Sequence, residues 1–488
     1  MVRSSRAGAP SAGRRLVSNT AWRAAAFGAR AAGGLVATIF VARTLGPLGF
    51  GRFQFALALT LLLGFVVMLG LPKLLVREIA RDPKGAATRI DSALFICLVA
   101  GGAVSGLLLG IGWAAGADRS LLFMVGLTMI ADSVGRIVMA LFWAVERMRY
   151  EAVAVGIQES AFVTFTLLAL AVDGGVEGVM LAYLTSRVIG FVVAWVIAAT
   201  KLSCATRPRR HAGVVRPMLK ATIPFAIDDG LSLAYVRIDA VLLGLLKGPT
   251  AVGLYQSATN LVLYLNVLPR MVNMSMYPQM SRAWPEQPWA IRRLRDASIR
   301  LLGAVAIPIT VGSIMLAPQI IGVLYGPKFE PAVRYYQLLV LVIPLRILGN
   351  TLGTAITSVD RQAQRAFIVG VAAALNVGLN LILIPMWSIF GAVVATLVTE
   401  SWVFLAYAVL LRRVLGPSHL LSAVAAPSLA CVPLALVVTA LSPAPLALLI
   451  VAGAAAYVVA LIGIVLVTMP RPDLNPRAVL SSFLAWSS

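Results

Sequence analysis

Charged residues are scarce in this chain of 488 residues, and acidic residues are the scarcest of them. Only 12% of the residues are charged, with 19 Asp and Glu against 41 Lys and Arg, while 60% are hydrophobic. Soluble domains are about one-quarter charged, and a globular protein could not hide this much apolar surface from water. The composition therefore excludes an ordinary soluble protein and predicts one that spans a lipid bilayer.

Residues that build metal sites and disulfides are also few. The three cysteines, Cys97, Cys204 and Cys431, lie far apart, and the two histidines, His211 and His419, lie in loops. No metal-ligand spacing, disulfide framework, phosphate-binding glycine loop or nucleophile elbow appears. We therefore predict a protein that is not an enzyme, with no catalytic residue, no metal and no cofactor. ATP-driven transport has no support within the chain.

Long apolar runs occupy most of the chain instead. A helix of about 20 apolar residues crosses a bilayer, so these runs predict an all-α integral membrane protein with about 14 transmembrane helices. No short apolar segment with a small-residue cleavage site precedes them, so no cleaved signal peptide is predicted. The predicted spans lie near 20–43, 50–72, 92–115, 121–143, 151–172, 176–200, 219–246, 251–278, 298–325, 334–358, 363–385, 389–411, 420–442 and 445–468.

The Lys and Arg residues alternate between the two sides of these spans. Most lie in the N-terminal tail and in the even-numbered connections, whereas the odd-numbered connections carry few. Because cytoplasmic loops are enriched in Lys and Arg, both termini are predicted to be cytoplasmic. The basic residues form no single patch, which argues against nucleic-acid binding. The predicted external loops are too short for the catalytic segment of a membrane polysaccharide polymerase.

Several stretches of the chain occur twice. "GPLGFGRFQFA" from Gly46 returns as "GPTAVGLYQSA" from Gly248, 202 residues later. Matches at offsets of 214 and 213 follow in the same order, from Val145 to Val359 and from Gly178 to Gly391. An even number of spans separates the copies, which predicts two six-helix lobes related by a pseudo-two-fold axis along the membrane normal. The Gly-Pro stretches are predicted to be tight outer turns.

This repeat defines the predicted domains. Two C-terminal helices lie outside the duplication and are predicted to be an addition to the lobes. The segments are a basic cytoplasmic tail at 1–19, an N-terminal lobe at 20–200, a basic cytoplasmic linker at 201–218, a C-terminal lobe at 219–414, two extra helices at 420–468 and a cytoplasmic tail at 469–488.

Four stretches resemble one family of membrane transporters. They are "VARTLGPLGFGRFQFALALTLLLGFVVMLGLPKLLVREIAR" from Val41, "RIDAVLLG" from Arg237, "VGLYQSA" from Val252 and "LYGPKFEPAVRYYQLL" from Leu324. The resemblance is to polysaccharide (O-antigen type) flippases. These lipid-linked oligosaccharide transporters belong to the superfamily that includes multidrug and toxin extrusion transporters and lipid II flippases. The resemblance covers nearly the whole chain.

This resemblance implies a function. The protein would flip a polyprenyl-pyrophosphate-linked oligosaccharide from the cytoplasmic to the outer leaflet of a bacterial cytoplasmic membrane by alternating access. Its expected partners are the bilayer and the lipid-linked oligosaccharide, together with a polysaccharide polymerase and glycosyltransferases. The alternatives are a proton- or sodium-coupled drug or metabolite exporter or a lipid II flippase of the same superfamily, and the ion-coupled cycle would make the protein an antiporter. A membrane polysaccharide polymerase is the alternative from another class.

Charged residues inside the predicted spans are the candidate site residues, because each costs about 3 kcal/mol or more if it faces lipid. Arginine suits a diphosphate since it stays charged and offers a planar fork of donors. The diphosphate-binding candidates are Arg30, Arg237, Arg270 and Arg346. The candidate sugar contacts are Gln256, Tyr264 and Asn266. The candidates for coupling to a proton or sodium ion are Asp228, Asp239 and Glu400.

Some of these charges have a purely structural alternative. Asp132 and Arg136 are four residues apart and can neutralise each other on one helix. Arg187 and Glu400 occupy equivalent positions of the repeat with opposite charge. They would either pair with each other across the two lobes or belong to the packing of separate lobes.

Overall fold

The computed structural model describes residues 12–114, 118–204, 206–265, 267–417 and 420–468. For some residues in these ranges only the backbone is described. They are residues 12–17, 227–229, 231–234, 236, 267–271, 274–275, 421–422 and 468. The chain divides into two compact units, Met1–Gly253 and Leu254–Ser488.

The described part of the first unit is built from helices. A helix satisfies its own backbone hydrogen bonds, which is what a chain inside lipid requires. The helices are α1 (Ala12–Met68), α2 (Leu71–Arg81), the short 3₁₀ helix η1 (Pro83–Gly85), α3 (Ala86–Ala114), α4 (Arg119–Ala144), α5 (Met148–Ala171), α6 (Gly175–Lys201), α7 (Ala212–Lys247) and the start of α8 (Pro249–Tyr264).

Two Gly-Pro junctions have the same backbone conformation. Gly46 bends α1 with φ 66° and ψ −176°, and Gly248 separates α7 from α8 with φ 85° and ψ 174°. A positive φ is readily adopted only by glycine, and the prolines that follow have no N–H to continue the preceding helix. The predicted first two spans are therefore the two arms of α1, bent at Gly46.

The segment after the second predicted span is a helix, where the sequence predicted a loop. Gly70 adopts a left-handed conformation with φ 74° and leads into α2, which begins with a proline in its first turn. Leu71, Leu74, Leu75 and Ile79 are buried on one face of α2. The i, i+3, i+4 spacing of these residues makes α2 amphipathic. Because its basic residues interrupt the apolar sequence, the segment lacks the long apolar run that predicts a span.

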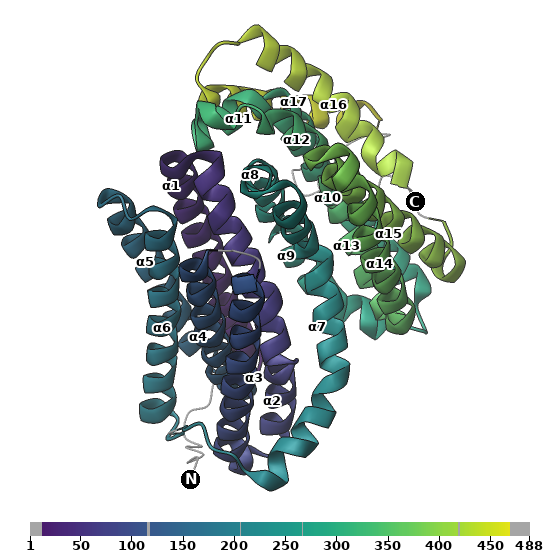
Figure 1. The fold of residues 1–488 in the computed structure, drawn as a ribbon. Helices are drawn as coiled ribbons and strands as arrows, with labels where there is room; N and C mark the ends of the chain where they lie inside the picture. Colours follow the sequence, from purple (N-terminus) through teal and green to yellow (C-terminus); the bar gives the residue numbers. More distant parts are fainter. Residues whose placement is uncertain (1–11, 115–117, 205, 266, 418–419, 469–488) are drawn as a thin grey trace. The chain divides into compact units, whose positions relative to one another are not determined.

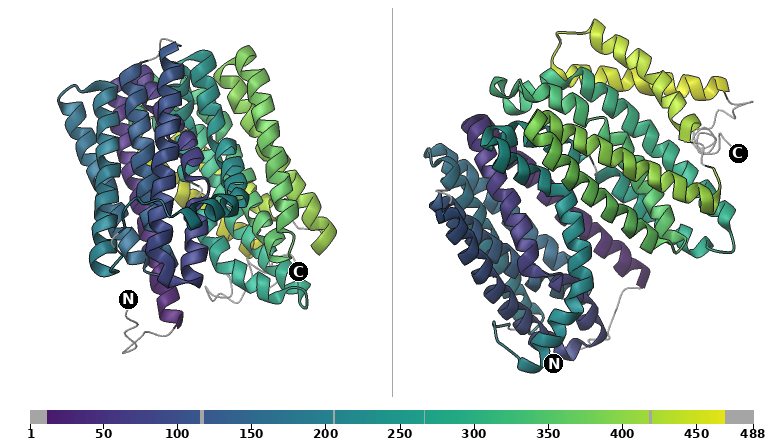
Figure 2. Two further views of the ribbon diagram at one scale, coloured as in Figure 1. Left: turned by 60° about the horizontal axis from the view of Figure 1, so that its bottom comes forward. Right: turned by 45° about the vertical axis from the view of Figure 1, so that its right-hand side comes forward.

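The core of the first unit lies among α2 to α6. In Figures 1 and 2 the dark helices of this unit run side by side, and α4 packs against α1, α3 and α6. α5 packs against α1 and α6, and α7 packs against α1 and α2. Buried apolar residues such as Ile90, Met129, Ile137 and Val155 form one continuous cluster.

The connection from α6 to α7 is held against the start of α3 by Asp91. The N–H of Arg207 donates to Asp91 Oδ1 at 2.7 Å, and the N–H of Arg209 donates to the Asp91 carbonyl at 3.3 Å. Nε1 of Trp195 donates to the Thr206 carbonyl at 3.0 Å. Cys204, which is part of this connection, is buried. The basic linker is thus fixed to the first unit.

The second unit contains more helix breaks than the sequence predicted. Three predicted spans, 251–278, 298–325 and 334–358, are each divided into two helices. One break has a plain cause, because Pro318 cannot continue the helix that precedes it. The helices are the rest of α8, α9 (Val267–Ala283), α10 (Pro288–Met315), α11 (Ala317–Tyr325), η2 (Pro327–Phe329), α12 (Ala332–Leu339), α13 (Val342–Ser358), α14 (Gln362–Trp387), α15 (Ile389–Leu415), α16 (Leu420–Ala440) and α17 (Leu446–Thr468).

The two C-terminal helices, yellow in Figures 1 and 2, pack against each other and against α10. Pro308 lies inside α10 and has no N–H, so the carbonyl of Ala304 lacks its helical partner. The hydroxyl of Tyr457 on α17 donates to that carbonyl at 2.7 Å. The tyrosine thereby satisfies a backbone group that the proline leaves open.

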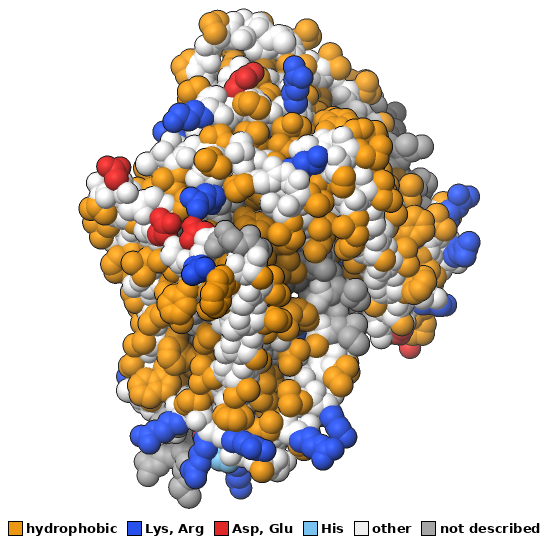
Figure 3. Space-filling view, in the orientation of Figure 1, with side chains coloured by type: hydrophobic (Ala, Val, Ile, Leu, Met, Phe, Trp, Pro, Cys, Tyr) orange, Lys and Arg blue, Asp and Glu red, His pale blue; other side chains and the backbone are white. Residues whose placement is uncertain are grey.

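Eleven helices in the described part are long and apolar enough to cross a membrane, with both arms of α1 taken as one of them. The predicted number of fourteen is thus approximate, while the predicted all-α membrane fold is confirmed. In Figure 3, hydrophobic side chains cover the sides of the helices, and Lys and Arg side chains gather where α2 and the start of α7 lie.

Candidate functional site

The first unit contains a network of charged side chains in the middle of its helices. Nη2 of Arg187 lies 3.1 Å from Glu159 Oε1, and Nη1 of Arg187 lies 3.9 Å from Asp132 Oδ1. The guanidinium also stacks on the ring of Tyr183, 4.4 Å from its centroid. Arg187 is only 6% exposed and Glu159 only 5%. Helices α4, α5 and α6 are therefore joined by one buried cation.

Two glycines let neighbouring helices close around this network. A Cβ on Gly33 of α1 would lie 3.0 Å from the Cβ of Glu159, and a Cβ on Gly190 of α6 would lie 2.8 Å from Gln158 Cδ. Nε2 of Gln158 donates to Glu159 Oε1 at 3.1 Å, so the glutamine holds the same carboxylate as Arg187. Small residues at these crossings bring α1 and α6 close to the carboxylate of α5.

Arg136 and Arg30 lie at the accessible side of the network. Nε of Arg136 donates to Asp132 Oδ2 at 2.8 Å, which confirms the predicted pairing along α4. The Arg136 side chain is nevertheless 45% exposed. Arg30 on α1 is exposed too and interacts electrostatically with Arg136, Glu159, Asp132 and Arg187.

The second unit contains a separate ion pair. Arg346 on α13 pairs with Glu400 on α15, with Nε of Arg346 at 2.8 Å from Glu400 Oε1. Nearby on α15, Thr399 accepts a long hydrogen bond of 3.5 Å from Asn376 of α14. Nδ2 of Asn380 donates to Asn376 Oδ1 at 3.0 Å, and both asparagines are buried. The diphosphate candidate Arg346 and the coupling candidate Glu400 are thus brought together.

The ion pairs of the two units occupy equivalent positions with exchanged signs. Arg346 follows Asp132 by 214 residues, and Glu400 follows Arg187 by 213, the same offsets as the sequence repeats. In each unit the pair joins the equivalents of α4 and α6. Arg187 and Glu400 therefore each find their partner within their own unit, which supports the second of the two alternatives for this pair.

The other predicted site residues fall into two groups. Asp239 is buried on α7 and its Oδ1 accepts a hydrogen bond from the N–H of Ala240 at 2.7 Å. Arg237 lies half-buried on the same helix, while Gln256 is buried and Tyr264 half-buried on α8. The remaining candidates lie outside the described side chains and stay predictions. They are Asp228, Arg270 and Asn266.

Several polar residues of these networks escaped the sequence prediction, and spacing could have identified three of them. Asn376 and Asn380 stand four residues apart in an apolar run, a spacing that places both on one helix face. Tyr183 precedes Arg187 by four residues, and this spacing would have predicted the stacking contact. In the described part, no group of three or more His, Cys, Asp or Glu side chains is arranged to hold a metal ion.

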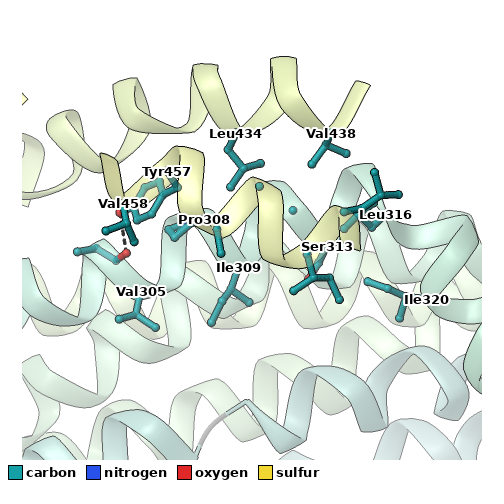
Figure 4. A pocket seen from close by; sticks show the side chains of 16 residues that line it. Val305, Pro308, Ile309, Ser313, Leu316, Ile320, Leu434, Val438, Tyr457 and Val458 are labelled. Atoms are coloured by element: carbon teal, nitrogen blue, oxygen red, sulfur yellow. Dashed lines mark hydrogen bonds between the residues drawn. The ribbon is translucent and has the colours of Figure 1, made fainter. Parts of the chain in front are cut away.

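A cavity of about 390 Å³ lies elsewhere in the second unit, between α10, α16 and α17 (Figure 4). Its walls are almost wholly apolar, with Ile309, Leu434 and Val438 among the lining side chains. Tyr457 borders it, but its hydroxyl is engaged by Ala304. None of the predicted site residues lines this cavity, so it is not the charged site.

Comparison with known families identifies the chain. The model of the family described as "Polysaccharide biosynthesis protein" matches residues 16–284, and that of the MatE family matches residues 224–382. The first match spans more than half of the chain. The chain belongs to the polysaccharide biosynthesis protein family. This family membership agrees with the resemblance of its motifs to a family of polysaccharide transporters.

Two curated relatives of this family member come from the archaeon Haloferax volcanii. "Probable flippase AglR" is 27% identical over 36% of this chain and 37% of its own length. "Probable low-salt glycan biosynthesis flippase Agl15" is 24% identical over 46% of this chain and 48% of its own length. The chain thus spans less than half the length of each of these relatives in the matched regions.

Solved structures establish the fold of this family member. "Lipid II flippase MurJ, inward closed conformation" superposes with a TM-score of 0.73 at 14% identity, over 90% of this chain and 98% of the other. An inward-facing multidrug resistance MATE family transporter of the MOP superfamily gives a TM-score of 0.64 at 14% identity, over 79% and 94% of the chains. The chain therefore has the MurJ/MATE-like fold of a multi-pass membrane protein.

Proposed function

We propose that this protein is a flippase that moves a polyprenyl-diphosphate-linked oligosaccharide from the cytoplasmic to the outer leaflet by alternating access. The exported glycan would serve the synthesis of a cell-surface polysaccharide. The proposal makes the protein a transporter without catalytic residues, in line with its relatives, which are flippases and transporters. The observation that carries it is the arginine-rich network in the middle of the membrane-spanning helices of the first unit.

The chemistry of this network suits a lipid-linked diphosphate. The diphosphate is anionic, and arginine stays charged and donates in a planar fork. An exporter of organic cations would need an acidic site instead, and the network contains Arg30, Arg136 and Arg187 against two carboxylates. The charges therefore favour an anionic substrate over the cationic drugs that the alternative would require.

The proposed direction and partners rest on the distribution of basic residues and on the family. Lys and Arg in the even-numbered connections favour cytoplasmic termini. The cytoplasmic membrane of a bacterium stays the proposed location, although both curated relatives are archaeal. Glycosyltransferases would supply the substrate and a polysaccharide polymerase would use the exported product.

We further propose that a proton or sodium gradient drives the cycle. The candidate carboxylates are Asp228, Asp239 and Glu400. A buried carboxylate changes charge when it binds a proton or a cation, and this change can favour another packing of the helices. Asp228→Asn is expected to abolish transport without loss of folding. Normal export by this variant would remove Asp228 from the mechanism.

The decisive experiment is translocation by the purified protein in lipid vesicles. A fluorescent polyprenyl-diphosphate oligosaccharide is incorporated, and its arrival in the other leaflet is measured by its accessibility to a membrane-impermeant reagent. Movement under a proton or sodium gradient, and none in protein-free vesicles, is the expected result. No movement under either gradient would defeat the proposed function. Lipid II and a cationic dye, assayed in parallel, separate the two alternatives within the superfamily.

A further inference from the structure

The charges of the first-unit network do not balance. Arg30, Arg136 and Arg187 bring three positive charges, whereas Asp132 and Glu159 bring two negative ones. All five lie near the middle of membrane-spanning helices. An uncompensated cation at this depth is costly. Among the described residues, the network therefore has one positive charge more than its own carboxylates neutralise.

The surplus charge does not reside on Arg187. This side chain is buried, and it contacts Glu159, Asp132 and the ring of Tyr183 at the same time. Its guanidinium is thus enclosed by two carboxylates and an aromatic face. A substrate could reach it only after these contacts had separated.

Arg136 is held in a different way. Its Nε donates to Asp132, and this is the only hydrogen bond that the described structure gives its guanidinium. The two terminal amino groups lie outside that bond, and 45% of the side chain is exposed. Asp132 is shared between Arg136 and Arg187, so its negative charge is compensated from two sides. The accessible edge of Arg136 therefore keeps its positive character.

Arg30 adds a second accessible guanidinium. It is exposed on α1, within electrostatic reach of Arg136, and no ion pair or hydrogen bond to a described residue engages its side chain. Two guanidiniums of like charge at mid-depth repel each other unless an anion lies between them. An anion with several oxygens, such as a diphosphate, can accept hydrogen bonds from both guanidinium groups at once. No single carboxylate among the described residues does this for Arg30 and Arg136.

We propose that Arg136, together with Arg30, binds the phosphate or diphosphate head of the lipid-linked substrate. This assignment rests on the proposed function and adds to it a residue on α4 that the sequence placed only in an internal pair. The ion pair with Asp132 and the contact with the substrate are compatible, because they use different edges of one guanidinium. The head is thus bound within the first unit, by helices α1 and α4.

Binding to the purified protein in phosphatidylcholine nanodiscs tests this assignment. The probes are undecaprenyl diphosphate and undecaprenol, which differ only in the head. Wild-type protein is expected to prefer the diphosphate. Arg136→Gln is expected to weaken diphosphate binding about tenfold or more, since a charged hydrogen bond is lost, and to leave undecaprenol unaffected. Arg136→Lys, which keeps the charge, is expected to retain part of the preference.

Arg81→Gln is the matched control, because Arg81 is an exposed arginine at the end of α2. It removes one positive charge and is expected to bind like the wild type. The unfolding temperature of each variant separates lost binding from lost folding. Arg136→Gln leaves Asp132 with Arg187, so the network keeps a compensated carboxylate.

Two results would overturn the assignment. If Arg136→Gln binds the diphosphate within twofold of the wild-type affinity, Arg136 does not bind the head of the substrate. The proposed function would still stand in that case if the wild type translocates the substrate in vesicles. The binding is repeated with the protein in phosphatidylglycerol nanodiscs. Loss of the preference for the diphosphate in these nanodiscs would show that bilayer headgroups, and not the substrate, occupy the site. Free pyrophosphate is expected to compete weakly, because it lacks the lipid tail. Absence of translocation by the wild type defeats the proposed function separately.

Discussion

Gly51 of α1 and Gly253 of α8 each pack against the other's Gly-Pro junction. A Cβ on Gly51 would overlap the carbonyl oxygen of Pro249, and a Cβ on Gly253 would overlap the carbonyl oxygen of Pro47. The contact is reciprocal because both glycines stand five residues after the glycine of their junction. The nearest atoms are backbone atoms on both sides, so an added methyl group could not be accommodated by the movement of a side chain.

We therefore expect Gly51→Ala and Gly253→Ala each to destabilise the protein by about 1–3 kcal/mol, the usual cost of overpacking. The unfolding temperature in detergent micelles measures the effect. Gly102→Ala in α3 is the control, since a Cβ there meets no atom within 4 Å. It is expected to be neutral or stabilising because alanine favours helix. An unchanged unfolding temperature for Gly51→Ala would contradict the close contact.

Tyr457→Phe tests the attachment of the C-terminal helices. Removing the hydroxyl leaves the Ala304 carbonyl without a partner, at an expected cost of about 1–2 kcal/mol. Pro308→Ala gives that carbonyl a helical partner, so Tyr457→Phe should cost less in this background. A double-mutant cycle on unfolding free energies measures the coupling. Equal costs in both backgrounds would show that the tyrosine does not replace the helical bond.

The exchanged signs of the ion pairs suggest a charge-swap experiment. Glu400→Gln removes the carboxylate that pairs with Arg346 and is expected to cost about 3 kcal/mol. The double variant Arg346→Glu/Glu400→Arg copies the sign order of Asp132 and Arg187 and is expected to recover most of that loss. Transport is assayed in parallel. Recovery of folding without transport supports the coupling role of Glu400, whereas a double variant as unstable as Glu400→Gln would contradict the pairing.

Cys204 reports on the connection between α6 and α7 in the first unit. Burial raises the pKa of the Cys204 thiol, and Asp91 raises it further, so little thiolate forms at neutral pH and maleimide labelling is expected to be slow. Asp91→Ala removes the acceptor of the Arg207 N–H and should speed labelling several-fold. A Cys97→Ala/Cys431→Ala background makes the signal specific. Asp173→Asn, in an exposed turn, is the control. In this variant Cys204 should be labelled at the same rate as in the Cys97→Ala/Cys431→Ala protein.

The protein's sequence alone predicts much of its fold, for a clear physical reason. Lipid makes long apolar runs helical regardless of their neighbours, so the spans and the Gly-Pro junctions are visible in the sequence. Pro318 marks the break near Leu316, whereas the break near Val340 is less visible, because its flanking residues are as apolar as the rest. The amphipathic helix α2 does not form a long apolar run, because Lys73, Arg77 and Arg81 interrupt it.

The candidate site is less predictable than the fold. Spacing along one helix identified the pair of Asp132 and Arg136, and the repeat identified Arg187 and Glu400 as equivalent positions. The sequence did not identify Glu159 as the partner of Arg187, because that contact joins two different helices, whose close packing at Gly33 and Gly190 only the tertiary structure shows.

What the sequence by itself determined is the membrane class, the duplicated pattern and the surplus of intramembrane arginine, since these depend on composition and periodicity. Only the tertiary structure decided which arginine is enclosed and which is accessible. Arg187 and Arg136 are chemically identical, and both stand near the middle of their helices. Contacts from α5 and α6 bury the first, while the second keeps one edge of its guanidinium open.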